Sequence, residues 1–379
     1  MKITGDWLTH PGVVGLCTAL EDAGHQALFV GGCVRNALMG RAVNDIDLST
    51  DALPETVTNI AKNAGFKVVP TGIDHGTVTV IAQGLPIEVT TFRRDVETNG
   101  RHAVVAFSPK IEEDAARRDF TMNALYADVR GLVIDPLGGL PDLLAHRVRF
   151  VGDADARIRE DYLRILRFFR FHAHYGDMAE GFDPEGLAAC AAHSAGLETL
   201  SKERVGSEMR KLLAAPDPVP AVAAMAMAGV LAVVLPGADV RGLGPFVHLA
   251  ALAGAAPDPI ARLASLGGVN PAEALRLSRA EGRRLAALRA AIGSPMSAAE
   301  LGYRLGATDG LNALVLRAAL FEQPVSGQAD VTRGAAAVFP VKAADLSALQ
   351  GAELGRALRQ IEARWIASDF RLPKAELLR

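Results

Sequence analysis

Residues 28–49, LFVGGCVRNALMGRAVNDIDLS, constrain this chain more than any other segment. A short apolar strand is predicted first, followed by Gly31-Gly32, by a helix start that carries Arg35, and by a polar turn that ends at Asp45-Ile46-Asp47. Because residues i and i+2 of a strand point to the same face, Asp45 and Asp47 are predicted to lie side by side. Two adjacent carboxylates repel each other, and a cation between them would offset that repulsion.

This combination favours a site for Mg2+ and a polyphosphate. Backbone N–H groups at Gly31 and Gly32 can approach phosphate oxygens, and Arg35 can add a charge-assisted hydrogen bond. Glu88 alternates with apolar neighbours on a predicted nearby strand and is a candidate third carboxylate. We therefore predict phosphoryl or nucleotidyl transfer, in which divalent ions activate a hydroxyl and neutralise pyrophosphate. The alternatives are a surface turn for the Asp pair and a solvated strand residue for Glu88.

Composition limits the possible partners and compartments. The chain has 379 residues, enough for two or three domains, and a net charge of −3, which argues against a uniformly basic nucleic-acid binder. From residue 260 onward, however, the chain has 16 Lys and Arg but only 11 Asp and Glu. This basic surplus is expected if the C-terminal part binds a polyanion, and it is equally expected if its Arg-rich helices simply face water. The few cysteines, and the lack of a signal-peptide pattern or a long apolar run, predict a cytoplasmic protein that does not enter a membrane.

The order of structural signals predicts an α/β head and an all-α remainder. Helix and strand signals alternate over residues 1–150, and strand signals largely stop after about residue 155. Residues 78–82 and 87–92 are predicted to form a hairpin, residues 120–127 a helix and residues 132–134 an edge strand. We divide the chain into a head at 1–150, helices at 151–214 and further helices at 215–379.

Two further segments carry candidate ligand-binding residues. In residues 115–125, AARRDFTMNAL, Asp119 and Asn123 stand one turn apart on the predicted helix and would face a ribose, with one of the two preceding arginines toward a phosphate. In residues 157–171, RIREDYLRILRFFRF, Arg164 is spaced to meet Glu160 and Asp161 on one helix face. Asp161 and Arg164 together would match the edge of a nucleobase. A helix cap and an ordinary salt-bridge ladder are the alternatives.

These blocks, in this order, resemble the motifs of the class II tRNA nucleotidyltransferases, the bacterial-type CCA-adding enzymes and their relatives the bacterial poly(A) polymerases. The resemblance covers roughly residues 27–213. The segments that carry it are GGCVRN…DIDLST, RRDFTMNALYAD, the run DPLGG from Asp135, REDYLRILRFFRF and SKERVGSEMRKLL. Asn36 departs from the family pattern, which commonly has Asp after the arginine, at a position that is not a metal ligand in the family.

The resemblance implies an α+β fold, with a polymerase-β-like head that contains a mixed sheet, followed by an all-α neck, body and tail. It implies catalysis by Asp45, Asp47 and Glu88, with Asp45 and Asp47 as the Mg2+ ligands. The nucleotide-binding residues that it implies are Gly31, Gly32, Arg35, Arg117, Asp119, Asn123, Glu160, Asp161, Arg164 and Arg167. Of these, Asp119 would read the ribose 2′-hydroxyl, and Asp161 and Arg164 would pair with the base while Glu160 orients Arg164.

The activity that the resemblance implies is addition of C, C and A to tRNA 3′ ends from CTP and ATP, without an obligate protein partner. Residues 93–115 resemble a loop that the family needs for the final A, and residues 66–81 lack the basic stretch of the poly(A) branch. A poly(A) polymerase or A-adding enzyme is the alternative within the class. A non-catalytic RNA-binding protein on the same scaffold is the alternative outside it, although binding alone gains nothing from paired carboxylates.

Two smaller predictions concern the rest of the chain. Arg276, Arg279 and Arg283 are predicted to share one helix face and to contact tRNA, because the basic surplus begins there; a solvated face is the alternative. Cys33 lies inside the first motif, and we expect it to pack as a small residue, because this chemistry needs no protein nucleophile.

Overall fold

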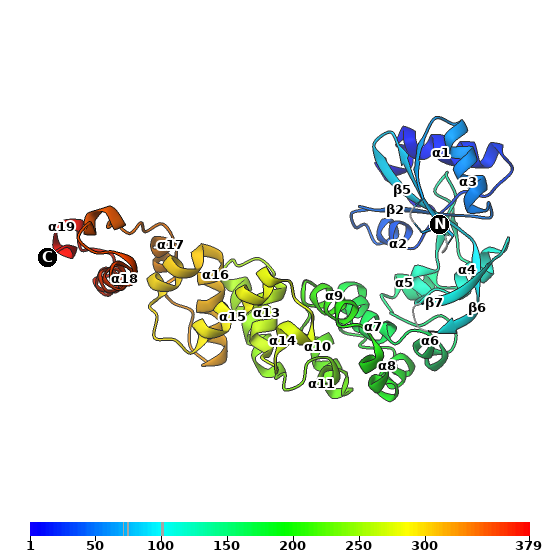
Figure 1. Cartoon of the computed structure of the whole chain (residues 1–379). Helices are drawn as coiled ribbons and strands as arrows, with labels where there is room; N and C mark the ends of the chain where they lie inside the picture. Colours follow the sequence, from blue (N-terminus) through cyan, green and yellow to red (C-terminus); the bar gives the residue numbers. More distant parts are fainter. Residues whose placement is uncertain (71, 74–75, 100–101) are drawn as a thin grey trace. The chain divides into compact units, whose positions relative to one another are not determined.

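The alternating signals of the first 150 residues fold as a mixed sheet with helices against it in this computed structural model (Figure 1). The structure describes residues 1–70, 72–73, 76–99 and 102–379. Within them, seven strands pair in the order β3-β4-β5-β2-β1-β8-β9. The strands are β1 (Leu28–Val30), β2 (Ile46–Thr50), β3 (Lys67–Val69), β4 (Thr77–Ala82), β5 (Leu85–Thr91), β8 (Tyr126–Ala127) and β9 (Val133–Ile134). Strands β2 and β5 run parallel, and the other neighbouring strands are antiparallel.

Helices α1 (Pro11–Asp22) and α3 (Pro54–Asn63) pack against each other and against β4. Strand β4 buries every second residue, as the predicted hairpin requires. A Cβ at Gly12 would stand 2.4 Å from the carbonyl oxygen of Ala82, so the glycine lets α1 lie directly on the strand. Helix α2 (Gly32–Leu38) contacts β1 and β2, and η1 (Asp6–Thr9) precedes α1.

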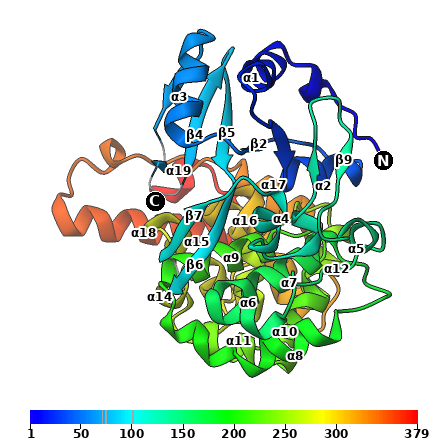
Figure 2. The ribbon, with the colours of Figure 1, turned by 90° about the vertical axis from the view of Figure 1, so that its right-hand side faces the viewer.

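A second, two-stranded sheet lies where we expected an irregular loop. Strands β6 (Arg93–Asn99) and β7 (His102–Phe107) form an antiparallel hairpin beside α4 (Ile111–Ala116), as Figure 2 shows. Gly100 and Arg101, part of the polar stretch on which the loop prediction rested, lie outside the described residues. In the described part of this segment the polar sequence nevertheless forms two paired strands.

Two helix predictions are wrong in detail. Residues 120–127 form a 3-10 turn, η3 (Thr121–Asn123), and then β8, because Tyr126 pairs with Val30 of β1 and Ile134 of β9. The helix expected over residues 157–171 is broken into α6 (Ala154–Glu160) and α7 (Leu163–Tyr175). Asp161 takes extended backbone angles at the break, and its carboxylate accepts a hydrogen bond from the backbone N–H of Leu163 at 3.1 Å.

The chain divides into two units, Met1–Leu200 with Met227–Val233, and Ser201–Ala226 with Val234–Arg379. The first unit also contains α5 (Leu140–Leu144), α8 (Pro184–Ala192) and η4 (Ser194–Thr199). Helices α10 (Val219–Met227) and α11 (Val230–Val234) cross the division. The boundaries that we drew at 150 and 214 are not those of the compact units, and they stay a prediction about function.

Among its described residues the second unit is helical, which confirms the all-α remainder. Its elements are α9 (Lys202–Leu213), η5 (Val240–Gly242), α12 (Leu243–Leu252), α13 (Pro259–Leu266), α14 (Pro271–Ala274), α15 (Arg279–Ile292), α16 (Ala298–Leu320), α17 (Gln328–Ala335), η6 (Ala343–Leu346), α18 (Gly351–Ala367) and α19 (Lys374–Leu377). An aromatic cluster around Trp365 forms a separate small core at the end of the chain. In the part of the chain that the structure describes, no helix is long and apolar enough to cross a membrane.

Candidate active site

Asp47 and Glu88 are register partners on the parallel strands β2 and β5. Paired residues on neighbouring strands point to the same face of a sheet. Their strand neighbours, among them Ile46 and Ile87, are buried, so both carboxylates point away from the apolar face. Asp45 lies just before β2 and is exposed. Asp47 and Glu88 thus lie side by side, and Asp45 is near enough for its charge to act on Asp47; their role as metal ligands stays a prediction.

The negative charge of Asp47 is unfavourable in the absence of a nearby cation. Burial raises the pKa of Asp47 to about 6, and the charges of Glu88 and Asp45 add to that rise, whereas Arg118 opposes it. No group of three or more His, Cys, Asp and Glu side chains among the described residues stands in a metal-binding arrangement. The donor set nevertheless fits a hard divalent cation, because carboxylate oxygens are the ligands that such ions prefer and a cation would offset the repulsion.

Gly31 has a backbone conformation that favours glycine, and its approach to a phosphate stays a prediction. It has φ 69° immediately before α2, a conformation that L side chains rarely adopt. A Cβ there would stand 3.3 Å from Nη1 of Arg118. Arg118 is fixed by Asp114 Oδ2, to which its Nη2 donates at 3.0 Å, and by the Tyr126 hydroxyl, to which its Nε donates at 3.2 Å. The Tyr126 hydroxyl in turn donates to Asp114 at 2.7 Å.

Arg118, and not Arg117, is therefore the arginine of the RRD run that lies beside Gly31 and acts on Asp47. We predicted only Arg117, whose backbone carbonyl accepts a hydrogen bond from Arg164 at 3.3 Å. Asp114 and Arg118 are spaced i,i+4, but Glu113 and Arg117 have the same spacing, so the local sequence did not distinguish the two arginines.

A hydrogen-bonded chain joins four of the predicted nucleotide-binding residues. Arg35 Nη1 donates to Asn123 Oδ1 at 2.6 Å, and Asn123 Nδ2 donates to Asp119 Oδ1 at 2.9 Å. Asp119 Oδ2 accepts from Arg167 Nε at 2.7 Å. Burial alone would raise the pKa of Asp119, but Arg167 and the donated hydrogen bonds hold it below its ordinary value. This series of hydrogen bonds connects α2 with η3 and α7.

Helix α7 is fixed on the head by aromatic packing. The ring centroid of Phe168 lies 5.4 Å from that of Phe150, and the centroid of Phe171 lies 4.9 Å from that of Phe120. These rings are buried, and their contacts set the position of Arg164 and Arg167, which stand on the same helix.

The break between α6 and α7 places Glu160, Asp161 and Arg164 together. The Glu160 carboxylate accepts hydrogen bonds from Arg164 Nη1 and, at 2.9 Å, from Arg157 Nη1. Arg164 Nη1 also donates to the Arg157 carbonyl oxygen at 2.8 Å. The predicted contact between Glu160 and Arg164 is confirmed, and the base-reading role of Asp161 and Arg164 stays a prediction.

Cys33 is a small buried residue, as expected. Its thiol donates to the carbonyl oxygen of Val30 at 3.3 Å, and burial raises its pKa to about 11. A thiol that stays protonated at neutral pH is a poor nucleophile.

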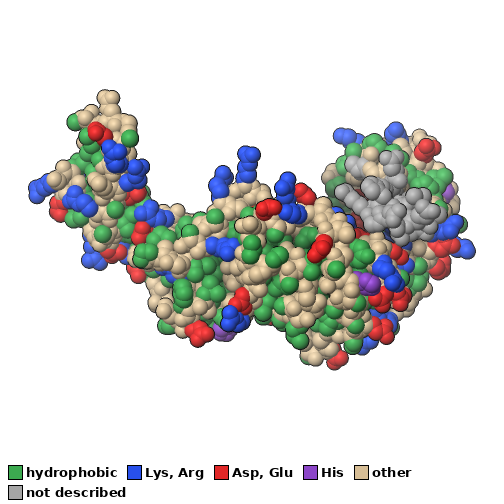
Figure 3. All heavy atoms as spheres, turned by 60° about the horizontal axis from the view of Figure 1, so that its bottom comes forward, with side chains coloured by type: hydrophobic (Ala, Val, Ile, Leu, Met, Phe, Trp, Pro, Cys, Tyr) green, Lys and Arg blue, Asp and Glu red, His purple; other side chains and the backbone are tan. Residues whose placement is uncertain are grey.

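Arg276, Arg279 and Arg283 do not share one helix face, so that prediction is wrong. Arg276 precedes α15 with φ 46°, and its Nε lies 3.1 Å from Glu203 Oε1. Ser278 caps α15, which begins at Arg279. Arg279 and Arg283 are exposed and one turn apart on that helix. On the face shown in Figure 3, Lys and Arg side chains form separate groups with Asp and Glu between them.

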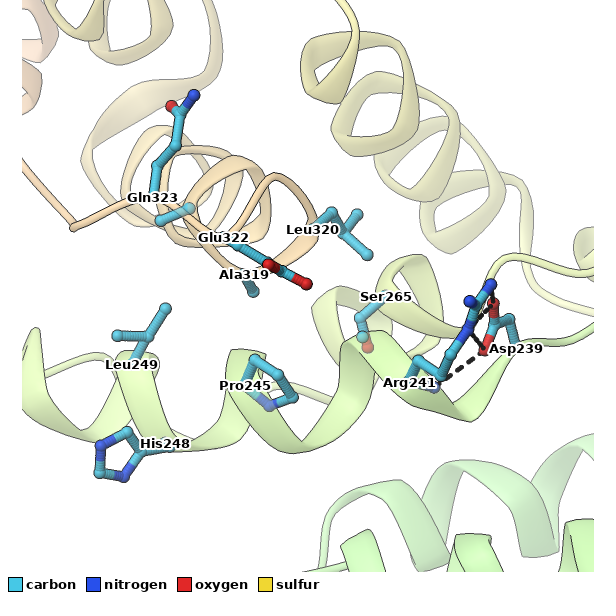
Figure 4. Close-up of a pocket in the computed structure, with 12 residues that line it drawn as sticks. Asp239, Arg241, Pro245, His248, Leu249, Ser265, Ala319, Leu320, Glu322 and Gln323 are labelled. Atoms are coloured by element: carbon cyan, nitrogen blue, oxygen red, sulfur yellow. Dashed lines mark hydrogen bonds and ion pairs between the residues drawn. The ribbon is translucent and has the colours of Figure 1, made fainter.

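A cavity of about 640 Å3 lies in the second unit and contains none of the predicted site residues (Figure 4). It is lined from η5, α12, α13 and the end of α16, with the ion pair of Arg241 and Asp239 at one side. All of its lining residues belong to the second unit.

Two segments of the chain match families of known proteins. Residues 27–149 match the family described as the Poly A polymerase head domain, and residues 181–241 match the probable RNA and SrmB-binding site of polymerase A. The CCA-adding enzyme of Geobacillus thermodenitrificans is 42% identical over 231 residues, which cover 60% of this chain and 55% of that protein. Human mitochondrial CCA tRNA nucleotidyltransferase 1 is 40% identical over 203 residues, 53% of this chain and 47% of that protein.

The chain thus spans about half the length of the curated relatives that it matches. The structural similarity covers more of the chain than the sequence similarity does. The crystal structure of the Bacillus stearothermophilus CCA-adding enzyme in complex with CTP has a TM-score of 0.76 and 31% sequence identity, over 95% of this chain and 94% of that one. The chain therefore belongs to the class II tRNA nucleotidyltransferase family of CCA-adding enzymes and poly(A) polymerases.

Proposed function

We propose that this protein adds the 3′-terminal C, C and A to tRNA from CTP and ATP. The observation that carries the proposal is the register pair of Asp47 and Glu88, with Asp45 beside it and Gly31 and Arg118 nearby. The likeness to a CCA-adding enzyme solved with CTP supports this choice of nucleotide.

The proposed reaction is an in-line displacement at the α-phosphorus. A bond forms between the tRNA 3′-oxygen and Pα, the bond from Pα to the bridging oxygen of pyrophosphate breaks, and the 3′-hydroxyl loses its proton. Asp45 and Asp47 would hold Mg2+, with Glu88 as third carboxylate; when bound, such ions lower the pKa of the attacking hydroxyl and neutralise the triphosphate. The side chains of Arg35 and Arg118 and the backbone at Gly31 and Gly32 would orient the triphosphate.

The remaining residues would select the nucleotide. Asp119, held by Asn123 and Arg167, would accept a hydrogen bond from the ribose 2′-hydroxyl. Asp161 and Arg164 would meet the base edge, while Glu160 fixes Arg164. The hairpin of β6 and β7 occupies the segment that we relate to addition of the final A, which supports complete CCA addition over CC addition alone.

The decisive experiment is extension of a tRNA transcript that ends at the discriminator base, with Mg2+ and CTP, ATP or both, resolved at single-nucleotide length. Two additions with CTP, and a third only when ATP is present, would establish the proposed function. A product that stops after CC would overturn complete CCA addition.

Other products would point to the alternatives. A long ladder with ATP alone would assign the protein to the poly(A) branch. No product, together with retained tRNA binding, would favour a binding protein on the same scaffold. The variant Asp47→Ala should abolish extension and retain tRNA binding, because it removes a predicted metal ligand and no predicted tRNA contact.

A further inference from the structure

Arg35 is held by neutral partners. Its Nε and Nη2 donate to Asn36 Oδ1 at 3.2 and 2.9 Å, its Nη1 donates to Asn123 Oδ1 at 2.6 Å, and its Nη2 donates to the Tyr175 hydroxyl at 2.8 Å. Among the described residues, the acceptors of this buried guanidinium are thus two amides and a phenol. Nearby Asp119 is paired with Arg167. Among the described residues, hydrogen bonds to neutral groups therefore set the position of the Arg35 guanidinium.

Tyr175 contacts this guanidinium through its ring as well as its hydroxyl. The ring centroid lies 4.1 Å from Cζ of Arg35 and 4.9 Å from Cζ of Arg41. A cation over an aromatic ring is attracted to it, and the attraction is stronger where water is excluded. Tyr175 is the last residue of α7, and its carbonyl oxygen lies 3.1 Å from Nδ1 of His146. That contact holds the backbone at Tyr175, and the ring centroid lies 5.4 Å from that of Phe171, a ring contact that does not involve Arg35.

Asn36 holds Arg35 more weakly than a carboxylate would at the same position. A single amide oxygen accepts from both Nε and Nη2, whereas a carboxylate could accept with two oxygens and a full charge. The Asn36 amide also donates to the carbonyl oxygen of Ala42 at 3.0 Å, which fixes its orientation. An uncharged residue at position 36 leaves Arg35 more dependent on its other partners.

We propose that Tyr175 is a positioning residue that holds Arg35 toward the incoming triphosphate and does the holding that a carboxylate at position 36 would otherwise do. The inference rests on the proposed function in assigning Arg35 to the triphosphate. It also links that assignment to α7, because the helix that ends at Tyr175 carries Arg164 and Arg167 near its start. Base and phosphate contacts would then be set by one rigid element.

The test measures nucleotide binding by isothermal titration calorimetry and steady-state extension of tRNA, for wild type, Tyr175→Leu, Tyr175→Phe and Asn36→Asp. Tyr175→Leu should weaken CTP and ATP equally, by about tenfold, because it removes both a hydrogen bond to a charged group and the attraction of the ring for the cation. KM should rise while kcat stays within about twofold. Tyr175→Phe keeps the ring and should weaken binding less.

A second substitution shows whether Tyr175→Leu acts on the position of Arg35 or damages the fold in general. Asn36→Asp combined with Tyr175→Leu should restore most of the affinity, because the new carboxylate takes over Arg35. Unchanged affinity in Tyr175→Leu, or a weakening that Asn36→Asp does not reverse, would overturn the inference. If Tyr175→Leu fails to fold, the same comparison is made with Tyr175→Phe. Wild-type protein that binds CTP but extends no tRNA would overturn the proposed function, and the binding comparison would still decide the role of Tyr175.

Discussion

Asp47 and Glu88 face the same side of the sheet from paired positions on the two parallel strands β2 and β5. One is half-buried and the other exposed, so the pair brings two negative charges together where water screens only one of them well. This relationship destabilises the head unless a cation binds. The cost of the pair to folding and the catalytic role that we propose for it thus have the same physical origin.

Asp47→Asn should abolish nucleotide addition and stabilise the protein in the absence of metal. The pKa of Asp47 is raised from 3.8 to about 6, and each unit corresponds to about 1.4 kcal/mol, so the neutral amide should gain on the order of 2–3 kcal/mol at pH 7. Thermal and urea unfolding in EDTA would measure this gain. A variant that is active, or that is less stable than wild type in EDTA, would contradict the metal assignment.

The same shift predicts how stability depends on pH. Folding raises the pKa of Asp47, so the folded state binds its proton more tightly than the unfolded state. The stabilisation that this proton gives is fully present below about pH 4 and is lost as pH rises through 6. Wild type and Asp47→Asn should therefore be about equally stable near pH 4, diverge as pH rises from 4 to 6, and differ by a nearly constant amount above pH 6. Unfolding midpoints in EDTA at pH 4, 6 and 8 would check this, and the same difference at all three would contradict it.

Glu160→Gln should blur the choice between CTP and ATP. Arg164 would keep its hydrogen bonds to the carbonyl oxygens of Arg157 and Arg117 but lose its charged acceptor, which holds the guanidinium less firmly. We expect discrimination to fall by about tenfold, because a hydrogen bond between charged groups contributes about that much. Single-nucleotide incorporation with each triphosphate gives the ratio. Glu273→Gln, which removes an exposed pair with Lys202, is the control and should leave the ratio unchanged.

Gly31→Ala should impair nucleotide binding beyond its effect on folding. The new methyl group would meet Arg118 Nη1 at 3.3 Å and block the backbone approach to phosphate. Gly40→Ala is the matched control, because Gly40 also has a positive φ but nothing lies within 4 Å of its would-be Cβ. Both variants should lose about 1–2 kcal/mol of stability. Only Gly31→Ala should weaken CTP binding, by tenfold or more in titration calorimetry; equal affinities would show that Gly31 has no special role.

The sequence was sufficient where local period decides the structure. Alternation in β4 and β5 predicted their hairpin, and the position of Glu88 between apolar residues predicted its face. The adjacency of Asp47 and Glu88 followed because each carboxylate occupies the polar side of a half-buried strand.

The sequence failed where partners far along the chain decide. Residues 120–127 have helical spacing, but pairing of Tyr126 with Val30 turns the segment into a strand. Helical period continues across Asp161, yet this residue is extended and ends α6, and its carboxylate accepts from the backbone N–H of Leu163. The choice of Arg118 over Arg117 depends on Tyr126, and the neutral partners of Arg35 include Tyr175, 140 positions away. Contacts between residues so far apart cannot be predicted from the local sequence pattern.

Arg279 and Arg283 remain the candidates for tRNA contact on α15, now without Arg276. Both are exposed and one turn apart, whereas Arg276 pairs with Glu203. Replacing both with Ala should weaken tRNA binding uniformly across tRNA sequences, and the slope of log K against log salt should fall by about one for each phosphate that the protein no longer neutralises. Electrophoretic mobility shifts at several salt concentrations would measure this. Arg241→Ala, which removes an exposed arginine paired with Asp239, controls for loss of charge alone, and a salt slope that falls equally in this control would contradict a specific role for α15.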